Sequence, residues 1–281
     1  MVDFNKKILN SNKFRQAALH FQKHGCYLFS PKGTSEYIKY WEEEEKRCLE
    51  GYTAEDGDFI TGYHYFYLNY CPIQRITEIE TKLKSGEIVK RKTKCQDFPD
   101  FYDYDYYFFC SVEEAEVEGK HMVVLKARRK GYSFKCSAMM CRNYYMIPNS
   151  KSYAYASEAE FLVKDGIITK AWEYMDFIDE HTAWSKKRQK IDTKMHRRSS
   201  VVVTDNTGNK IEVGYKSDII GVTVKNDIQK VRGKAGKLIL FEEAGKFPNL
   251  LEAWNIARSS VEQDGYVYGT MIAFGTGGCI S

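Results

Sequence analysis

The pattern of apolar and polar positions changes at about residue 120 of the 281-residue chain. Beyond that point short apolar runs alternate with longer amphipathic segments, which predicts strands alternating with helices. The expected strands lie at 121–127, 152–156, 237–241 and 266–274, and the expected helices at 133–146, 158–180 and 249–263. Apolar strands in such an alternation indicate an α/β fold with a mostly parallel sheet that helices cover on both faces.

The first 120 residues have a different pattern, of helix followed by short aromatic strands. Residues 34–51 contain strong helix formers and end at Gly51, which predicts a helix. The aromatic segment 57–74 is rich in β-prone residues and predicts strands or an aromatic wall over a ligand. We therefore expect an N-terminal helical extension over residues 1–56 and an α/β domain over residues 57–281.

Turn and cap signals refine this outline. The polar segments 82–92 and 200–215 have glycine-containing turns at their centres and predict two hairpins. Ser157 and Glu160 form an S-x-x-E capping box, which predicts the start of the helix at 158–180.

Composition excludes several classes of protein. The chain is 43% hydrophobic and 15% aromatic, and this composition excludes a disordered protein. No apolar run approaches the roughly 20 residues of a membrane span, and the first residues lack a signal-peptide core, so we expect a soluble intracellular protein without a membrane partner. The eight cysteines are scattered without a C-x-x-C pair, which favours free thiols. His20, His24 and Cys26 have helix-face spacing for a metal, but no fourth ligand is near, so we do not expect zinc.

Charge is distributed unevenly, although the net charge is only +4. Segment 184–200 holds seven basic residues and one acid, Asp192. The basic residues are Lys186, Lys187, Arg188, Lys190, Lys194, Arg197 and Arg198. This local excess predicts either a polyanion partner at one face or an ordinary solvated face, and composition does not decide between them.

The segment "HMVVLKARRKGYSFKCSAM", residues 121–139, has the outline of a phosphate-binding loop between a strand and a helix. Gly131 and Ser133 stand at the turn and hydroxyl positions, but Tyr132 stands where such loops carry lysine. The charge can come from another position, and Lys126, five residues before the glycine, is within reach. Taken alone, the segment is better explained as a basic turn.

Two adjacent carboxylates, Glu242 and Glu243, follow the apolar strand of "KLILFEEAGKF", about 110 residues beyond the loop. Buried acids at the carboxyl edge of a parallel strand are unfavourable unless a cation or partner lies beside them. In ATPases one such acid serves the Mg²⁺ shell and a second polarises the attacking water. An exposed acidic turn is the alternative, but the pairing with the loop favours an ATPase.

At this point the sequence resembles the ATPase domain of bacteriophage large terminase subunits, the DNA-packaging motors of tailed phages. Some members have a deviant phosphate loop K-x-x-R-x-G-Y-S, which Lys126, Arg129, Gly131, Tyr132 and Ser133 match. The segment "VRGKAGKLILFEEA" resembles the family's Arg-Gly element and acidic strand, "MIAFGTGG" its coupling motif, and "GYHYFYLNYCPIQ" its adenine-binding segment. The resemblance covers residues 57–278 and implies an ASCE-type P-loop NTPase fold.

The resemblance also implies ATP and Mg²⁺ as cofactors and a role for each matching residue. Glu243 would orient water, Arg129 would stabilise the transition state, and Thr276 would sense the γ-phosphate. Ser133 and Glu242 would hold Mg²⁺, and Gln74 would meet the adenine edge, with Tyr70 or its neighbours stacking. The nucleotide-binding set is Gln74, Lys126, Arg128, Arg129, Lys130, Gly131, Tyr132 and Ser133. Arg128 is a second candidate for the transition-state arginine within the loop, and Arg188 or Arg197 are candidates acting on a neighbouring subunit.

The implied partners are double-stranded DNA, a homo-oligomeric ring, expected to be a pentamer, on the portal, and the small terminase subunit, in the cytoplasm of an infected bacterium. The candidate DNA contacts are Lys186, Lys187, Arg188, Arg197 and Arg198. The family usually has aspartate where Glu242 stands, and the family's nuclease domain is absent, so we expect an excised domain or half of a split protein. A helicase-like DNA translocase and a nucleotide-binding scaffold that does not hydrolyse remain as alternatives.

Overall fold

A seven-stranded sheet forms the centre of the protein in the computed structural model, which describes residues 3–225 and 227–276. The strand order is β5-β15-β12-β6-β11-β8-β7, and the strands from β5 to β11 run parallel, whereas β8 and β7 are antiparallel. In that order the strands are β5 (Met122–Leu125), β15 (Thr270–Gly275), β12 (Leu238–Glu242), β6 (Lys151–Ala156), β11 (Asp218–Thr223), β8 (His196–Arg198) and β7 (Ile191–Asp192). The prediction of an α/β fold with a mostly parallel sheet is confirmed.

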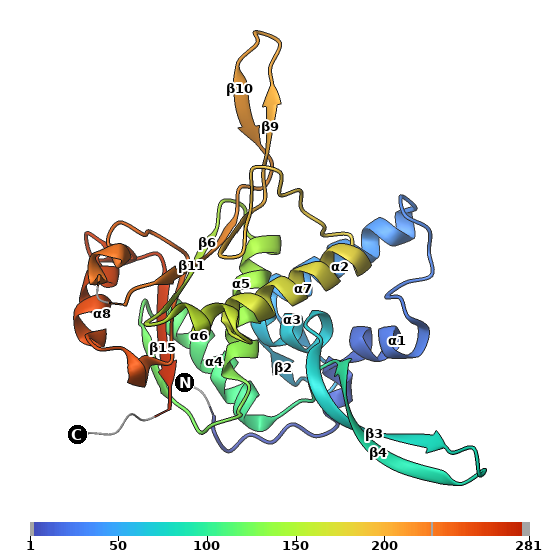
Figure 1. Ribbon diagram of the computed structural model, residues 1–281. Coiled ribbons are helices and arrows are strands. Elements are labelled where there is room, and N and C mark those ends of the chain that lie inside the picture. The colour runs from blue at the N-terminus through green and yellow to red at the C-terminus, as the bar shows by residue number, and fades with distance from the viewer. Residues whose placement is uncertain (1–2, 226, 277–281) are drawn as a thin grey trace.

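Helices cover both faces of the sheet, as the apolar strands require. Leu238 and Leu240 of β12 belong to one core cluster, shared with α5 (Tyr132–Met146) and α7 (Ile167–His181), while Ile239 and Phe241 belong to a second cluster, shared with α8 (Leu250–Arg258). In Figure 1, α8 accordingly lies on one side of the sheet, and α5 and α7 lie on the other.

The N-terminal helices extend the first of these clusters. They are the 3-10 helix η1 (Ser11–Phe14), α1 (Gln16–His24), α2 (Ser35–Glu50), α3 (Gly62–Tyr70) and α4 (Asp103–Val117). The helix predicted at 34–51 is confirmed as α2, whose first turn is capped by the Thr34 hydroxyl and which ends at Gly51, where φ is 91°. Phe14, Trp41 and Cys48 are buried in the same core as the sheet, so this part of the chain packs as one body with the rest.

Two predictions of local structure are wrong. Residues 62–70 form helix α3 rather than aromatic strands, and only the short strands β1 (Tyr52–Thr53) and β2 (Phe59–Ile60) precede it. Every residue of α3 is buried, so no polar face marked it as a helix, and the Thr61 hydroxyl caps its first turn. Its aromatic residues reflect this burial and not a pleated surface.

The helix predicted at 158–180 is broken into α6 (Ala159–Val163) and α7. Asp165 adopts φ 57°, and a Cβ on Gly166 would lie 2.1 Å from the Phe161 carbonyl oxygen, so the chain turns where glycine alone fits. The expected capping box does not form, because Glu158 occupies the N-cap position and caps α6 with no side-chain hydrogen bond.

Two hairpins extend from the body of the protein (Figure 1). Strands β3 (Ile73–Lys82) and β4 (Ile88–Asp97) form one, and β9 (Val201–Thr204) and β10 (Lys210–Val213) form the other, which confirms both predicted hairpins. A third pair, β13 (Glu262–Gln263) and β14 (Tyr266–Val267), follows α8, which ends at Arg258 and is shorter than predicted. No helix in the described parts of the chain has the length and apolar character needed to cross a membrane.

Candidate active site at the carboxyl edge of the sheet

The connection from β5 to α5 has the backbone geometry of an anion-binding loop. Gly131 is the N-cap of α5 with φ 71°, a left-handed conformation that glycine adopts at little energetic cost, and Arg129 is also left-handed, with φ 62°. The backbone N–H of Lys126 donates to the Gly275 carbonyl at 3.0 Å, which ties the start of the loop to the end of β15. The free N–H groups at the start of α5 therefore face the edge where the parallel strands end.

The hydroxyl of Ser133 and the carboxylate of Glu242 meet at this edge. Ser133 Oγ donates to Glu242 Oε1 at 2.6 Å, although the two residues are more than a hundred positions apart. Glu242 is only 4% exposed, and burial raises its pKa to about 7, even though Ser133 and the charge of Lys126 act in the opposite direction. The ionised form of this buried carboxylate would therefore be stabilised by water or by a cation beside it.

One atom of this pair fits a bound metal. Oε2 of Glu242 is buried and accepts no hydrogen bond from the described residues. Such an orphaned acceptor is unfavourable unless something completes its coordination. Carboxylate and hydroxyl oxygens are the ligands that Mg²⁺ prefers, so Ser133 and Glu242 fit this ion.

The displaced lysine lies beside the second carboxylate. Lys126 Nζ is 3.3 Å from Glu243 Oε1, and the two side chains are 10% and 22% exposed. Glu243 adopts φ 50°, a left-handed conformation that is uncommon for a residue other than glycine. The structure thus brings Lys126, Ser133, Glu242 and Glu243 together from two distant segments, as the sequence predicted.

Strand β15 separates the loop strand from the acidic strand and ends at the same edge. A Cβ on Gly275 would lie 2.8 Å from the backbone nitrogen of Ala244, so glycine is needed for β15 to approach the acidic turn this closely. Thr276 follows directly and is half-buried, and its neighbour Gly275 accepts the hydrogen bond from the Lys126 N–H. The remaining glycines of the predicted coupling motif, Gly277 and Gly278, lie outside the described residues.

Three cations of the loop are exposed to solvent, namely Arg128, Arg129 and Lys130. Within the described parts of the chain, Arg128 and Arg129 form no ion pair or side-chain hydrogen bond. Lys130 Nζ lies 5.0 Å from the centre of the Tyr104 ring. The loop therefore presents uncompensated positive charge at the site.

Tyr132 has a structural role that the sequence did not reveal. Its ring packs edge-on against Phe108, with ring centres 5.1 Å apart, and lies 3.7 Å from the Nζ of Lys135. Lys135 is fully buried and donates to Asp105 Oδ1 at 2.5 Å. The tyrosine in the lysine position therefore covers the buried ion pair of Lys135 and Asp105. No sequence signal marked the pair, because its partners belong to different helices.

The predicted adenine contacts are not brought to the loop. Tyr70 is fully buried and its hydroxyl donates to Glu44, so the expectation that it stacks on a base is wrong. Gln74 is exposed near the base of the β3–β4 hairpin, paired across the strands with Gln96, and has no contact with the loop among the described interactions.

A different aromatic pair lies beside the loop. Tyr102 and Tyr104 stack with ring centres 5.1 Å apart and an interplanar angle of 12°, and they are 46% and 37% exposed. The tyrosine-rich segment 97–110 contains both kinds of aromatic residue: Tyr106 and Phe108 are buried and pack in the core, whereas Tyr102 and Tyr104 are exposed.

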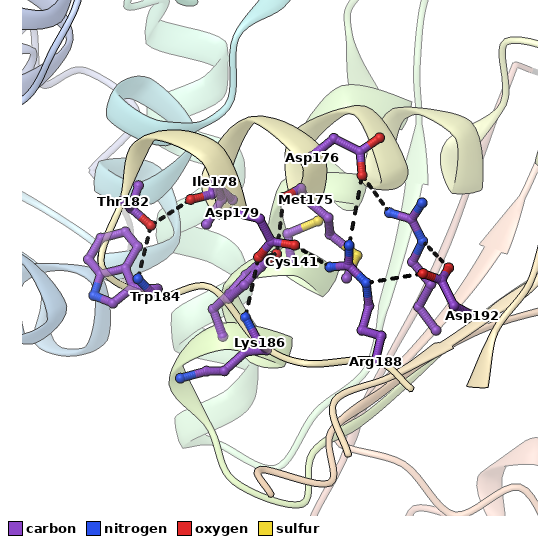
Figure 2. A network of polar contacts seen from close by, with 12 residues as sticks. Cys141, Met175, Asp176, Ile178, Asp179, Thr182, Trp184, Lys186, Arg188 and Asp192 are labelled. Atoms are coloured by element: carbon purple, nitrogen blue, oxygen red, sulfur yellow. Dashed lines mark hydrogen bonds and ion pairs between the residues drawn. The ribbon is translucent and has the colours of Figure 1, made fainter. Parts of the chain in front are cut away.

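The basic segment at 184–200 is largely neutralised within the chain. Arg188 forms an ion pair with Asp179 and lies within ion-pair distance of Asp176 and Asp192, as Figure 2 shows. Arg197 bonds Asp176 at 2.9 Å and Asp192 at 3.0 Å.

The neighbouring basic residues follow the same pattern. Arg198 pairs with Glu212 and Asp218, and Lys186 Nζ lies 4.2 Å from the centre of the Tyr215 ring. Lys187 remains exposed. The arginines of the predicted polyanion surface are therefore paired within the chain, with acids of α7, β7, β10 and β11.

We also searched the described residues for metal sites made of histidine, cysteine or acidic side chains. No cluster of three or more histidine, cysteine or acidic side chains occurs in these parts of the chain, and the seven cysteines they contain are free thiols. The rings of His20 and His24 pack against each other with centres 4.6 Å apart.

Fold and site together define a class of protein. Strand β5 leads through the glycine-containing loop into α5, which carries the Ser133 hydroxyl. One strand, β15, separates β5 from β12, which is buried and ends in the two carboxylates. This is the arrangement of an ASCE-type P-loop NTPase fold.

Comparison with known proteins finds similarity among solved structures only. No protein-family model and no curated protein matches the sequence. The ATPase domain of the large terminase of Thermus phage P74-26 is 15% identical, with a TM-score of 0.41 over 58% of this chain and 61% of that chain. The large terminase of bacteriophage HK97 is 11% identical, with a TM-score of 0.43 over 64% of this chain and 34% of that chain. The large terminase of a thermophilic bacteriophage, in complex with ADP, is 10% identical, with a TM-score of 0.37 over 56% of this chain and 33% of that chain.

The chain is thus similar to phage large terminases, the family that its motifs resemble, and it spans less than two thirds of each of these proteins. At these low identities and TM-scores the similarity carries no functional argument.

Proposed function

We propose that the protein is the ATP-hydrolysing domain of a motor that moves double-stranded viral DNA into a procapsid. One observation carries the hydrolytic part of this proposal: Ser133 and Lys126 of the loop are bonded to Glu242 and Glu243 of the acidic strand. A loop that served only as a basic turn would have no reason to hold a buried, orphaned carboxylate oxygen at the end of a neighbouring strand.

Each residue of the site has a role in this proposal. The N–H groups at the start of α5 and the ammonium of Lys126 bind the β- and γ-phosphates of ATP. Ser133 and Glu242 hold Mg²⁺, which when bound supplies charge stabilisation at the phosphate oxygens. Glu243 accepts a hydrogen bond from the attacking water and orients it for in-line attack.

The pairing of Lys126 with Glu243 links phosphate binding to this last role. Phosphate oxygens of ATP compete with Glu243 for the Lys126 ammonium, so ATP binding releases the Glu243 carboxylate from this ion pair. Arg129 lies exposed in the same loop and stabilises charge in the transition state, and Thr276 passes the state of the γ-phosphate to the end of β15.

The nucleoside is placed by the stacked tyrosines. Tyr104 lies beside Lys130 and is exposed at the start of α4, so we propose that the adenine ring packs against the Tyr102–Tyr104 pair. Stacking of a base on an aromatic side chain contributes about 1–3 kcal/mol. This placement replaces Tyr70 and leaves no stacking role for the buried aromatic residues of α3.

The assembly part of the proposal follows the family resemblance. The motor acts as a homo-oligomeric ring, proposed to be a pentamer, on the portal, with the small terminase subunit delivering DNA in the cytoplasm of the infected bacterium. Because Arg188 and Arg197 are held by acids of their own chain, we favour Arg129 of the loop over either of them as the transition-state arginine.

The proposal is tested by ATP turnover of the wild type and three variants, measured with and without double-stranded DNA. Glu243→Gln removes the acceptor that orients water and is expected to lower kcat by about 10²–10⁴-fold while ATP still binds. Lys126→Ala is expected to abolish turnover, because no other lysine lies beside Glu243 among the described ion pairs. Lys130→Ala is the comparison and is expected to keep turnover, because its ammonium lies over the Tyr104 ring and not beside Glu243, so any loss should appear in the KM for ATP.

Wild-type turnover that Glu243→Gln leaves unchanged would contradict the assignment of the catalytic carboxylate. ATP binding without turnover in the wild type, in any assembly state and with DNA present, would instead support a nucleotide-binding scaffold.

A further inference from the structure

The β3–β4 hairpin is longer than its contacts with the rest of the protein require. Each strand has ten residues, about 33 Å of extended chain. The ribbon projects from the body of the protein (Figure 1). A two-stranded hairpin alone is at best marginally stable, so a projecting ribbon of this length contributes little to the stability of the fold.

Only the base of the ribbon is fixed to the body. Ile73 packs against the main core, and Arg75 donates to the Phe98 carbonyl at 2.9 Å and to Asp100. Further out, Ile76 and Ile88 are 69% and 61% exposed on the same face of the ribbon. The outer part therefore stands in solvent, where it is free to meet a partner.

Positive charge dominates this outer part. Residues 76–94 contain six basic residues and three acids, Glu78, Glu80 and Glu87. The basic residues are Lys82, Lys84, Lys90, Arg91, Lys92 and Lys94. Strand register places Lys82, Lys90, Lys92 and Lys94 on one face, with Lys84 in the turn and Arg91 on the opposite face.

Neutralisation of these charges within the chain is weak, in contrast to the basic segment at 184–200. Lys90 and Lys92 lie 3.8 Å and 4.0 Å from Glu80 and Glu78, and all four side chains are more than half exposed. Exposed pairs of this kind contribute about 0–1 kcal/mol and exchange readily for another anion. Lys82, Lys84, Arg91 and Lys94 form no ion pair within the described residues.

We propose that the outer β3–β4 ribbon is the surface by which this protein holds the phosphate backbone of double-stranded DNA. This inference rests on the proposed motor function for the choice of polyanion, and it moves the DNA contact from residues 186–198 to residues 82–94. The major groove, about 12 Å wide, admits a two-stranded ribbon, whose lysines then reach the phosphates on both sides. Lysines that bind phosphates carry no sequence readout, which suits a protein that must move along any sequence.

The test compares two variants of equal charge change. The ribbon variant replaces Lys82, Lys84, Arg91 and Lys94 by Gln, and the control replaces four exposed lysines elsewhere by Gln, namely Lys23, Lys32, Lys39 and Lys164. Affinity for a random-sequence DNA duplex is measured over a range of salt concentrations. The ribbon variant is expected to bind roughly tenfold more weakly or worse, with a log-log salt slope shallower by about 0.9 for each phosphate that is no longer neutralised. The control is expected to keep most of the wild-type affinity and slope.

Two further readouts make the outcome unambiguous. Replacing Lys82, Lys84 and Lys94 by Arg keeps the charge and is expected to retain binding, and the ribbon variant is expected to turn over ATP at the wild-type rate without DNA. Equal weakening in the ribbon variant and the control, no weakening in either, or a wild type that binds no duplex at low salt would overturn the inference. None of these results bears on Glu243→Gln, so failure of the DNA surface and failure of the ATPase proposal remain distinguishable.

Discussion

Glu242 has a carboxylate whose burial is energetically unfavourable unless a bound group completes its contacts. It ends a fully buried strand, its Oε2 lacks a hydrogen-bond partner among the described residues, and burial raises its pKa to about 7 from an ordinary value of 4.5. Near neutral pH part of the population therefore carries an unfavourable buried charge. A cation bound at the site would remove this penalty, so metal binding and ionisation of Glu242 are coupled.

This coupling predicts a pH-dependent stability without metal. A carboxyl group whose pKa is higher in the folded state stabilises the fold fully below about pH 4.5, and that contribution is lost as pH rises through about 7. The loss is on the order of 3 kcal/mol for a shift of this size. Glu242→Gln lacks the titrating group. In EDTA, the free energy of unfolding of the variant minus that of the wild type should therefore increase between about pH 5 and pH 8.

Urea unfolding of both proteins at the two pH values measures the difference. A stability gap between them that does not change with pH would show that Glu242 titrates normally. Adding Mg²⁺ at the higher pH is expected to stabilise the wild type and not the variant.

At the scale of elements, α5 is held in position by more than its apolar contacts. Lys135 and Asp105 join α5 to α4 through a buried ion pair, and the ring of Tyr132 covers the ammonium. Burial lowers the pKa of Lys135 and raises that of Asp105, so each charge depends on the other. The N-terminus of α5, and with it the β5–α5 loop, is thereby anchored to α4.

Breaking this pair is expected to be costly and asymmetric. Lys135→Met leaves Asp105 buried without its partner and should lower the free energy of unfolding by about 3–5 kcal/mol. The double variant with Asp105→Leu removes both charges and should recover much of that loss. Denaturant unfolding of the three proteins gives the comparison, and equal stability of the single and double variants would mean that the ion pair does not anchor α5.

At the scale of the whole molecule, the arrangement of charge separates two surfaces. The arginines at 188, 197 and 198 fix α7, β8 and β10 to one another, whereas the cations of the β5–α5 loop and of the outer β3–β4 ribbon are exposed and only weakly paired. Arg129, exposed in the loop beside the site, is therefore expected to act within its own subunit.

Mixing subunits tests this expectation. An Arg129→Ala subunit combined with a Glu243→Gln subunit should remain inactive, because neither contains a complete site. Arg197→Ala is the comparison, and we expect it to keep turnover by itself if it folds. Recovery of turnover in the Arg129→Ala mixture would show that the arginine acts on a neighbouring subunit.

Local sequence patterns by themselves determined much of this protein. Apolar runs and turn residues were sufficient for four of the five parallel strands, both hairpins and helix α2, because burial on both faces and turn geometry are encoded within a few residues. Strand β11 was not expected from the sequence. The loop residues Lys126, Gly131 and Ser133 and the acids Glu242 and Glu243 could be named as candidates, because a phosphate site would need these residue types at strand ends, although the loop taken alone was better explained as a basic turn.

Tertiary structure alone decided the rest. Whether Arg188 and Arg197 are free depends on Asp176 and Asp179 of α7, and whether Tyr70 or Tyr104 is exposed depends on how α3 and α4 pack against the core. Helix α3 was hidden because a segment buried on every side has no polar face to reveal its period. Side-chain charge and aromaticity are properties of the sequence, but their availability to a ligand is a property of what the fold places beside them.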